Sequence, residues 1–199
     1  MKYYPIRGAI LHGSGGTDSN SNASTLHHTA DDINRWHKIR FGDDCLSSLS
    51  MWGGYHFFID QYGKTTQFRK DDEEGCHCKF FNRGYMGICL AGNFDIEHPT
   101  DAQTASLKVL WKELVKKYPQ LLGTLRPHRN FAFKSCPGNL ISNDWIRIID
   151  DSAAKTPEDT QVVVDAHLQE RRLMQKTLNG IMAILASLRE TVERRVNKK

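Results

Sequence analysis

The sequence contains no run of about 18 consecutive apolar residues, so it offers no candidate for a transmembrane helix. Its beginning, MKYYPIRGAILHGSGG, lacks the apolar stretch of about 7 to 15 residues and the cleavage site that mark a secretory signal peptide. The net charge is only +4, and the basic residues do not interleave with aromatic residues along a stripe, which argues against nucleic acid as the partner. These absences predict a chain that is made in the cytoplasm without a signal peptide, has no transmembrane segment and binds no nucleic acid.

Cysteine is sparse and unevenly placed. The chain of 199 residues has five cysteines, an odd number, and they lack the close spacing of a small disulfide-rich domain. A disulfide framework is therefore not expected, and a reducing compartment is the favoured interpretation. Cys76 and Cys78 flank His77, but in an extended chain the two thiols point to one side and the imidazole to the other. We therefore expect these two cysteines to be structural rather than ligands of a shared metal ion.

Short apolar runs bounded by turn residues, together with helical patterns, predict a sheet with helices packed on it. Strand-like runs occupy residues 6–12, 55–60, 64–68, 84–94 and a segment that ends at Leu125. One helix should begin after its cap Thr29 and stop at Gly42, and another should begin at the capping box formed by Thr100 and Gln103. No repeat of fixed period is present. We predict an α/β fold, with a mixed central β-sheet flanked by α-helices and a C-terminal helical extension.

The composition changes after residue 151. Residues 152–159 form a polar linker, and residues 160–199 are predicted to form a helical tail. Apolar residues of this tail follow one another at alternating spacings of four and three: Met174, Leu178, Ile181, Leu185, Leu188 and Val192. That pattern is typical of a coiled-coil seam, which would make the tail a homo-oligomerisation segment. A helix docked on its own domain and an amphipathic, membrane-active tail are the alternative interpretations.

The stretch with the most chemistry is RPHRNFAFKSCPG, residues 126–138. His128 and Cys136 are eight residues apart in it, near enough for both to bind one metal ion, and Lys134 places a cation between them. Zinc favours nitrogen and sulfur donors, and a catalytic zinc ion keeps three protein ligands and one open position for water. On spacing alone, a surface histidine, a structural cysteine and a solvated lysine are the ordinary alternative.

A third ligand has to come from elsewhere in the chain. The doublet His27–His28 looks like a metal-binding pair, but it directly precedes the helix that Thr29 should cap, and the stretch before it is too polar for a strand. His12 instead ends an apolar strand, a rigid element that can hold a ligand in place. We therefore predict one Zn²⁺ ion bound by His12, His128 and Cys136.

Several separated motifs occur in the order seen in a known family. They are ILHGSG, TADDINRWHK, GGYHFFID, GCH followed by Asn82, GICLAGNF, PTDAQ and HRNFAFKSCPG. In these motifs the chain resembles the zinc-dependent N-acetylmuramoyl-L-alanine amidases, which include phage lysozyme-amidases, bacterial cell-wall recycling amidases and peptidoglycan-recognition proteins. The resemblance spans about residues 6–149 and is strongest to the phage enzymes.

The resemblance implies an activity and further site residues. It implies a peptidoglycan hydrolase that cleaves the amide bond between N-acetylmuramic acid and L-alanine, with residues 1–151 as the catalytic domain. Tyr55 matches the family's catalytic tyrosine and Lys134 its catalytic lysine, whereas His77 and Asn82 match positions that line the peptidoglycan groove. A phage lysis enzyme of this type is made in the host cytoplasm and acts on the wall after the membrane is disrupted.

The sequence also departs from the family, and two other functions compete. The loop after His12 is longer than in the compact phage enzymes, Tyr85 stands where the family usually has a small hydroxyl residue, and Gly13 replaces a residue that is often larger. A non-catalytic peptidoglycan-binding module is one alternative, but such members typically lack the cysteine ligand that is present here as Cys136. A cytoplasmic muropeptide-recycling amidase is the other. The pairing of Tyr55 with Lys134 and the helical tail favour the lysis enzyme.

Overall fold

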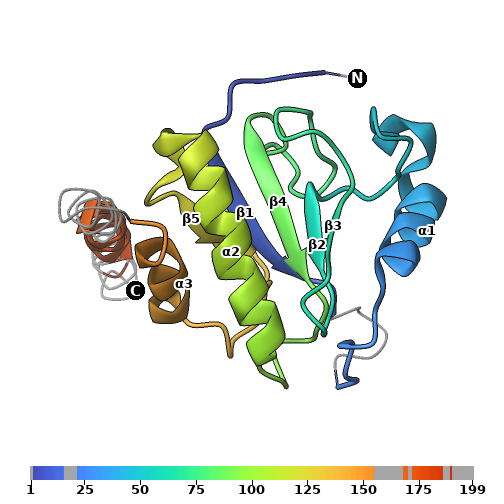
Figure 1. The fold of residues 1–199 in the computed structure, drawn as a ribbon. Helices are drawn as coiled ribbons and strands as arrows, with labels where there is room; N and C mark the ends of the chain where they lie inside the picture. The colour runs from blue at the N-terminus through green and yellow to red at the C-terminus, as the bar shows by residue number, and fades with distance from the viewer. Residues whose placement is uncertain (1, 16–21, 155–167, 170–171, 186–188, 190–199) are drawn as a thin grey trace, which may run out of the picture.

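The computed structural model describes residues 2–15, 22–154, 168–169, 172–185 and 189. Its centre is a five-stranded sheet in the order β3-β2-β4-β1-β5 (Figure 1). The strands are β1 (Gly8–Gly13), β2 (Phe57–Ile59), β3 (Thr65–Gln67), β4 (Tyr85–Leu90) and β5 (Leu125–Pro127). β3 pairs with β2 as an antiparallel hairpin, and all other neighbours are parallel. The predicted mixed sheet is confirmed.

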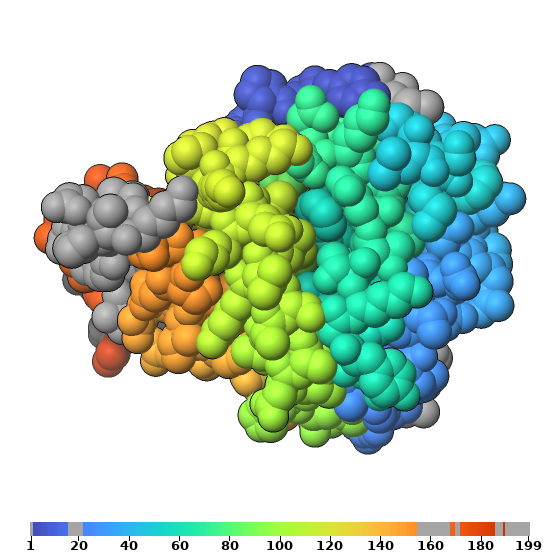
Figure 2. Space-filling view, in the orientation of Figure 1, coloured from blue at the N-terminus to red at the C-terminus, as the bar shows by residue number. Residues whose placement is uncertain are grey.

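Helices lie on both sides of this sheet. The α-helices are α1 (Ala30–Phe41), α2 (Asp101–Lys117) and α3 (Asn143–Asp151), and the short 3-10 turns are η1 (Gly42–Cys45), η2 (Pro119–Leu121) and η3 (His128–Asn130). α2 crosses in front of the strands with α3 beside it, whereas α1 lies beyond β2 and β3 (Figure 1). In the space-filling view, α2 runs along the surface between α3 and the segment that carries β2 and β3 (Figure 2).

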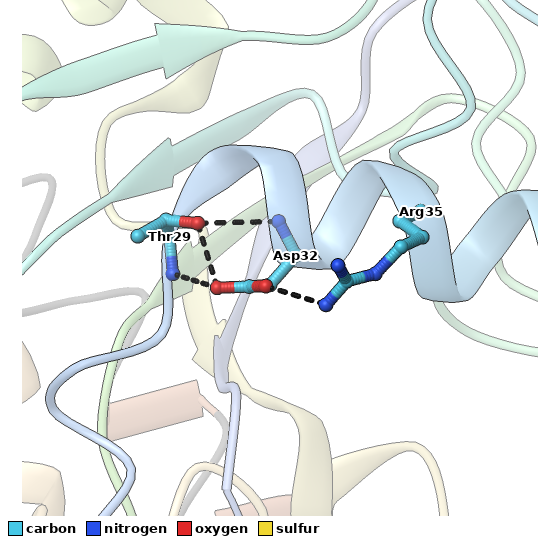
Figure 3. A network of polar contacts seen from close by, with 3 residues as sticks. All are labelled: Thr29, Asp32 and Arg35. Carbon is cyan, nitrogen blue, oxygen red and sulfur yellow. Dashed lines mark hydrogen bonds and ion pairs between the residues drawn. The ribbon is translucent and has the colours of Figure 1, made fainter.

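Both predicted helix starts are confirmed, and each has a reciprocal cap. The Thr29 hydroxyl accepts a hydrogen bond from the Asp32 N–H, and the Asp32 carboxylate accepts one from the Thr29 N–H (Figure 3). The other oxygen of Asp32 binds Arg35 at 2.8 Å. These bonds satisfy N–H groups that have no partner inside a helix, so they fix where α1 begins. α1 ends at Gly42, whose φ of +57° is a conformation that favours glycine.

The two faces of the sheet carry different sets of residues, because successive side chains of a strand point to opposite sides. The main core lies between the sheet and α2 and α3, and β1 contributes Ala9 and Leu11 to it. A smaller cluster on the α1 side contains Ile33, Phe58 and Cys89. His12 pairs with Cys89 in the sheet register, so it also points to the α1 side. The candidate site therefore lies on the face opposite the main core.

The expectation that no disulfide forms is wrong for one pair. Cys45 and Cys76 form a disulfide with an S–S distance of 2.50 Å, across a sequence separation of 31. The pairing arises from tertiary structure: η1 carries Cys45, and the backbone N–H of Cys76 is bonded to the carbonyl of Gly54 at 2.9 Å. Sequence spacing could not reveal this contact. Cys78 is buried and free, as expected of a structural cysteine.

The described part of the C-terminal tail is helical and exposed. Residues 168–169, 172–185 and 189 are in helical conformation, and the rest of the predicted tail, including Leu188 and Val192, lies outside the described residues. The described members of the predicted seam have exposed fractions of 61% for Met174, 52% for Leu178, 49% for Ile181 and 53% for Leu185. These side chains are therefore available to a partner. Within the described residues, no helix combines the length and apolarity needed to cross a membrane.

Candidate metal centre

Three side chains from distant parts of the sequence meet on the α1 side of the sheet. His12, His128 and Cys136 each offer one ligand atom, and these atoms all lie within 4.8 Å of one another. The His12 Nδ1 atom is 3.8 Å from the Cys136 sulfur, and the two imidazole centroids are 4.4 Å apart. In the part of the chain that the structure describes, no other group of three such side chains could hold a metal ion.

The loop that carries His128 and Cys136 is fixed by two neighbouring charged residues. Arg129 donates from its backbone N–H to the Cys136 carbonyl at 2.7 Å, and its guanidinium reaches the Ile141 carbonyl at 2.8 Å. Asp95, after β4, accepts from the Ser135 hydroxyl and from the Asn139 N–H, both at 2.7 Å. Sequence reasoning missed these roles, because a charged residue in a polar loop gives no signal of its backbone partners.

Gly13 allows this loop to close over β1. A Cβ at Gly13 would lie 2.6 Å from the Pro137 carbonyl oxygen, a distance that real Cβ atoms essentially never show. The Cys136–Pro137 peptide bond, next to this contact, is cis. Gly13 is therefore required for the close approach of the cysteine loop to β1. The sequence alone did not indicate this role.

Burial keeps the candidate ligands in their uncharged forms. The pKa of His128 is lowered to about 4, first by burial and then by the positive charge of Lys134. Burial also lowers the pKa of His12 well below its usual value and raises the pKa of the Cys136 thiol to about 11. Both imidazoles therefore keep a free lone pair at neutral pH. The Cys136 thiol has to lose its proton when a metal ion binds.

Tyr55 lies beside the three ligand candidates. Its ring centroid is 5.0 Å from that of His12, and the ring is partly buried. Burial raises the pKa of the Tyr55 phenol well above its usual value, and the neighbouring Cys89 adds to that shift. The hydroxyl therefore stays protonated at neutral pH, as a proton donor requires.

Lys134 lies on the same loop as His128 and Cys136, but its side chain is exposed. Its positive charge lowers the pKa values of both His12 and His128, which places it within electrostatic reach of the two rings. The structure thus brings Tyr55 and Lys134 to one site with the three ligand candidates.

His77 and Asn82 are also near, but their polar atoms contact the protein. His77 Nδ1 is 3.0 Å from His12 Nε2, and its Nε2 is 3.0 Å from the Tyr85 carbonyl. The Asn82 side-chain oxygen accepts from the backbone N–H groups of His77 and Cys78, at 2.9 and 2.8 Å. A substrate-binding role for the two residues stays a prediction.

The doublet His27–His28 lies outside the group. The imidazole of His28 is 3.0 Å from the Ser14 hydroxyl and packs edge-on against Trp36 with centroids 4.6 Å apart. His27 is exposed, and its ring meets that of His28 edge-on, with centroids 5.0 Å apart. The doublet is therefore not part of the group formed by His12, His128 and Cys136, and the choice of His12 as a ligand stays a prediction.

His37 is a site residue that sequence reasoning placed only on a helix. Its Nδ1 accepts a hydrogen bond from the Gly54 N–H at 2.6 Å, and its ring centroid is 5.2 Å from that of Tyr55. Burial is the main reason that its pKa is lowered to about 4. His37 thus holds the backbone next to Tyr55. Helical spacing predicts which face of the helix carries His37, but not that this face meets the backbone at Gly54.

The sequence is similar to a family of known proteins. The sequence profile of the N-acetylmuramoyl-L-alanine amidase family matches residues 2–139. The endolysin of Escherichia phage T7 is 32% identical over 119 residues, which cover 57% of this chain and 72% of that protein.

The fold is similar to those of solved amidase structures. The N-acetylmuramoyl-L-alanine amidase LysC from Clostridium intestinale is 26% identical with a TM-score of 0.59, over 73% of this chain and 85% of that one. The endolysin amidase LysCS from the same organism is 27% identical with a TM-score of 0.55, over 68% of this chain and 77% of that one.

Proposed function

The chain belongs to the N-acetylmuramoyl-L-alanine amidase family, and we propose that it cleaves peptidoglycan with one Zn²⁺ ion bound by His12, His128 and Cys136. It is a peptidoglycan amidase, which hydrolyses the amide bond between N-acetylmuramic acid and L-alanine. The observation that carries the metal assignment is the convergence of these three side chains beside Tyr55 and Lys134. A non-catalytic binding module would not need this set of ligands with a proton donor and a cation.

The donor set fits zinc. Two imidazole nitrogens and one thiolate sulfur are the ligands that zinc prefers, and three protein ligands leave one tetrahedral position open. Zinc–nitrogen and zinc–sulfur bonds of about 2.05 and 2.3 Å place the two donors about 3.6 Å apart on a tetrahedral ion. The distance between His12 Nδ1 and the Cys136 sulfur is 3.8 Å, close to that value.

The residues of the site can each be given a chemical role. A zinc ion held by His12, His128 and Cys136 would supply a Lewis acid and would lower the pKa of a bound water toward about 7. The protonated Tyr55 hydroxyl, beside the His12 ring, orients the attacking water or relays a proton from that water to the leaving nitrogen, so that the phenol ends the step protonated. Lys134 stabilises the negative charge that develops on the oxygen of the scissile amide. We assign substrate contacts to the part of the site near His77 and Asn82, because these two positions match the family's substrate-binding residues.

Metal analysis of four proteins tests the ligand assignment. The wild-type chain and the variants His12→Ala, Cys136→Ala and His28→Ala are purified, and their zinc content is measured. We expect the wild type and His28→Ala to retain one zinc ion, and the other two variants to lose it. Retention of zinc by His12→Ala, or its loss from His28→Ala, would show that the ligand set is wrong.

The activity has a separate test. The zinc-loaded protein is incubated with purified peptidoglycan, and the release of stem peptides with a free L-alanine amino group is measured. Release is expected, and its absence from a protein that has one bound zinc ion would contradict the proposed function and favour a binding module.

We further propose that the enzyme acts in phage lysis, because the relatives include endolysins of phages such as T7. In that role it is made in the host cytoplasm and reaches the wall after the membrane is disrupted. The rates on intact sacculi and on soluble anhydro-muropeptides are compared. Faster turnover of sacculi supports the lysis role, whereas a clear preference for soluble fragments would identify a recycling amidase.

A further inference from the structure

We propose that His77 is a positioning residue for the metal centre, because it fixes the tautomer and orientation of the His12 ring. This inference rests on the proposed function, since it assumes that His12 binds zinc. The observation that carries it is an ordered pair of contacts: the Tyr85 carbonyl to His77 Nε2, and His77 Nδ1 to His12 Nε2, each at 3.0 Å.

The direction of the first contact follows from chemistry alone. A backbone carbonyl oxygen can only accept a hydrogen bond, so the Nε2 atom of His77 has to carry the proton and donate it to the Tyr85 oxygen. A neutral imidazole carries one proton, so the Nδ1 atom of His77 then has a free lone pair. The Tyr85 carbonyl therefore makes His77 an acceptor toward His12.

The second contact fixes the tautomer of the proposed ligand His12. His77 Nδ1 can accept only if the Nε2 atom of His12 carries the proton and donates it. The Nδ1 atom of His12 is then unprotonated, and it is the nitrogen that lies 3.8 Å from the Cys136 sulfur. The tautomer selected by His77 is thus the one that presents a lone pair to the proposed zinc ion. Ligating histidines commonly need such an outer partner for their second nitrogen.

The fold makes room for the His77 ring at one position of the sheet. Gly87 lies in the central strand β4, and a Cβ there would be 2.7 Å from Cγ and Cδ2 of His77. No side chain could occupy position 87 without displacing the ring. The turn before the strand is held in addition by Asn82, whose side chain accepts from the His77 N–H at 2.9 Å. His77 therefore has a partner at its backbone N–H and at both ring nitrogens, and its ring occupies the space that Gly87 leaves open.

This assignment differs from a substrate contact in a way that can be measured. Both ring nitrogens of His77 already have protein partners, so a substrate hydrogen bond would have to replace one of them. A substrate-binding residue changes KM and leaves zinc affinity intact. A positioning residue for His12 changes zinc affinity in the absence of any substrate.

The test measures zinc dissociation constants by competition with a chelator, without substrate. The variants are His77→Ala, which removes both contacts, and His77→Asn, whose side-chain oxygen can take the place of Nδ1 as acceptor. His27→Ala removes an exposed histidine outside the cluster and serves as the matched control. We expect His77→Ala to bind zinc about 10- to 100-fold more weakly, His77→Asn to recover most of the affinity, and His27→Ala to match the wild type.

The results separate failure of this inference from failure of the proposed function. If His77→Ala binds zinc as tightly as the wild type while His12→Ala loses it, the positioning role is wrong and the ligand set stands. If the wild type itself binds no zinc, the proposed function fails.

Nitrogen-15 NMR of the wild-type imidazoles provides a second measurement, which needs no variant to fold. Both His12 and His77 should carry their proton on Nε2. A proton on Nδ1 of His77 would overturn the inference.

Discussion

The backbone N–H of Arg129 donates a hydrogen bond to the carbonyl oxygen of Cys136 at 2.7 Å. The bond joins the residue after one proposed ligand to the other proposed ligand, so the loop closes into a ring of backbone that holds His128 and Cys136 toward the same point. The protein therefore fixes the separation of the two ligands before a metal ion binds. Less conformational entropy is then lost on binding.

Gly13→Ala should disturb this loop. The new Cβ would lie 2.6 Å from the Pro137 carbonyl oxygen, so the cysteine loop has to move away from β1. We expect a loss of about 1–3 kcal/mol in the free energy of unfolding and weaker zinc binding. Gly180→Ala is the matched control, because nothing lies within 4 Å of a Cβ at that helical position. Urea unfolding and zinc competition measure both effects. Equal behaviour of the two variants would show that the contact is unimportant.

Lys134→Ala should reduce turnover while leaving the metal in place. The side chain is exposed and is not one of the three ligand candidates, so zinc content should match the wild type. We expect kcat to fall about 10²- to 10³-fold, the usual cost of removing one donor to a developing oxyanion. Lys79→Ala removes another exposed lysine and should have no such effect. A change in KM alone would assign Lys134 to substrate binding instead.

Tyr55→Phe isolates the phenolic hydroxyl. The ring that packs 5.0 Å from His12 and 5.2 Å from His37 remains, so the fold and the zinc content should be preserved. We expect kcat to fall about 10²- to 10⁴-fold, because a proton donor is lost. Tyr62→Phe, at a tyrosine that is 81% exposed, provides the comparison. Unchanged kcat in Tyr55→Phe would rule out a catalytic role for the hydroxyl.

His56 should make the fold sensitive to acid. Burial is the main cause that lowers its pKa to about 3, and its Nδ1 accepts from the Gly87 N–H at 3.0 Å. Since the unfolded chain protonates this histidine near pH 6.5, its contribution to stability is complete above that pH. The contribution is lost as the pH falls from about 6.5 toward 3, with a slope approaching about 1.4 kcal/mol per pH unit.

Urea unfolding of the wild type and of His56→Gln between about pH 4 and pH 7 measures this slope. The variant should be less stable at neutral pH, and its free energy of unfolding should depend less on pH. Parallel curves for the two proteins would contradict the assignment of the acid sensitivity to His56.

Removal of the tail tests self-association. The described seam residues are about half exposed, and a chain truncated after Ala154 keeps Ala153, which is buried in the main core. We expect light scattering to show an oligomer for the full chain and a monomer for the truncated one, because burial of these apolar side chains would hold the copies together. The same mass per particle for both chains would leave the docked or membrane-active interpretation of the tail.

The sequence was sufficient for the parts of the fold that depend on local pattern. Thr29 and Thr100 marked helix starts because capping is a local interaction, and the apolar runs marked the strands of the sheet. His12 could be preferred to His28 because a strand end is recognisable from its neighbours. These inferences need only residues close together in the chain.

Other features depend on which segments meet in three dimensions. The Cys45–Cys76 disulfide, the contact of His37 with the backbone before Tyr55, and the contact of His77 with His12 each join residues from different elements. The family resemblance placed His77 in the site, but it could not supply the orientation of the ring. That orientation decides whether the residue faces substrate or a ligand.

The division of the sheet into a core face and a metal face has a consequence for how such a protein can change. Along β1, the side chains of Ala9 and Leu11 pack in the core, whereas that of His12 lies in the candidate metal centre. Neighbouring positions therefore contribute to different properties, stability at one and chemistry at the other. Substitutions at one set can alter the chemistry while the other set preserves the fold. Selection, or a protein engineer, can therefore vary specificity and thermal tolerance through largely separate groups of residues.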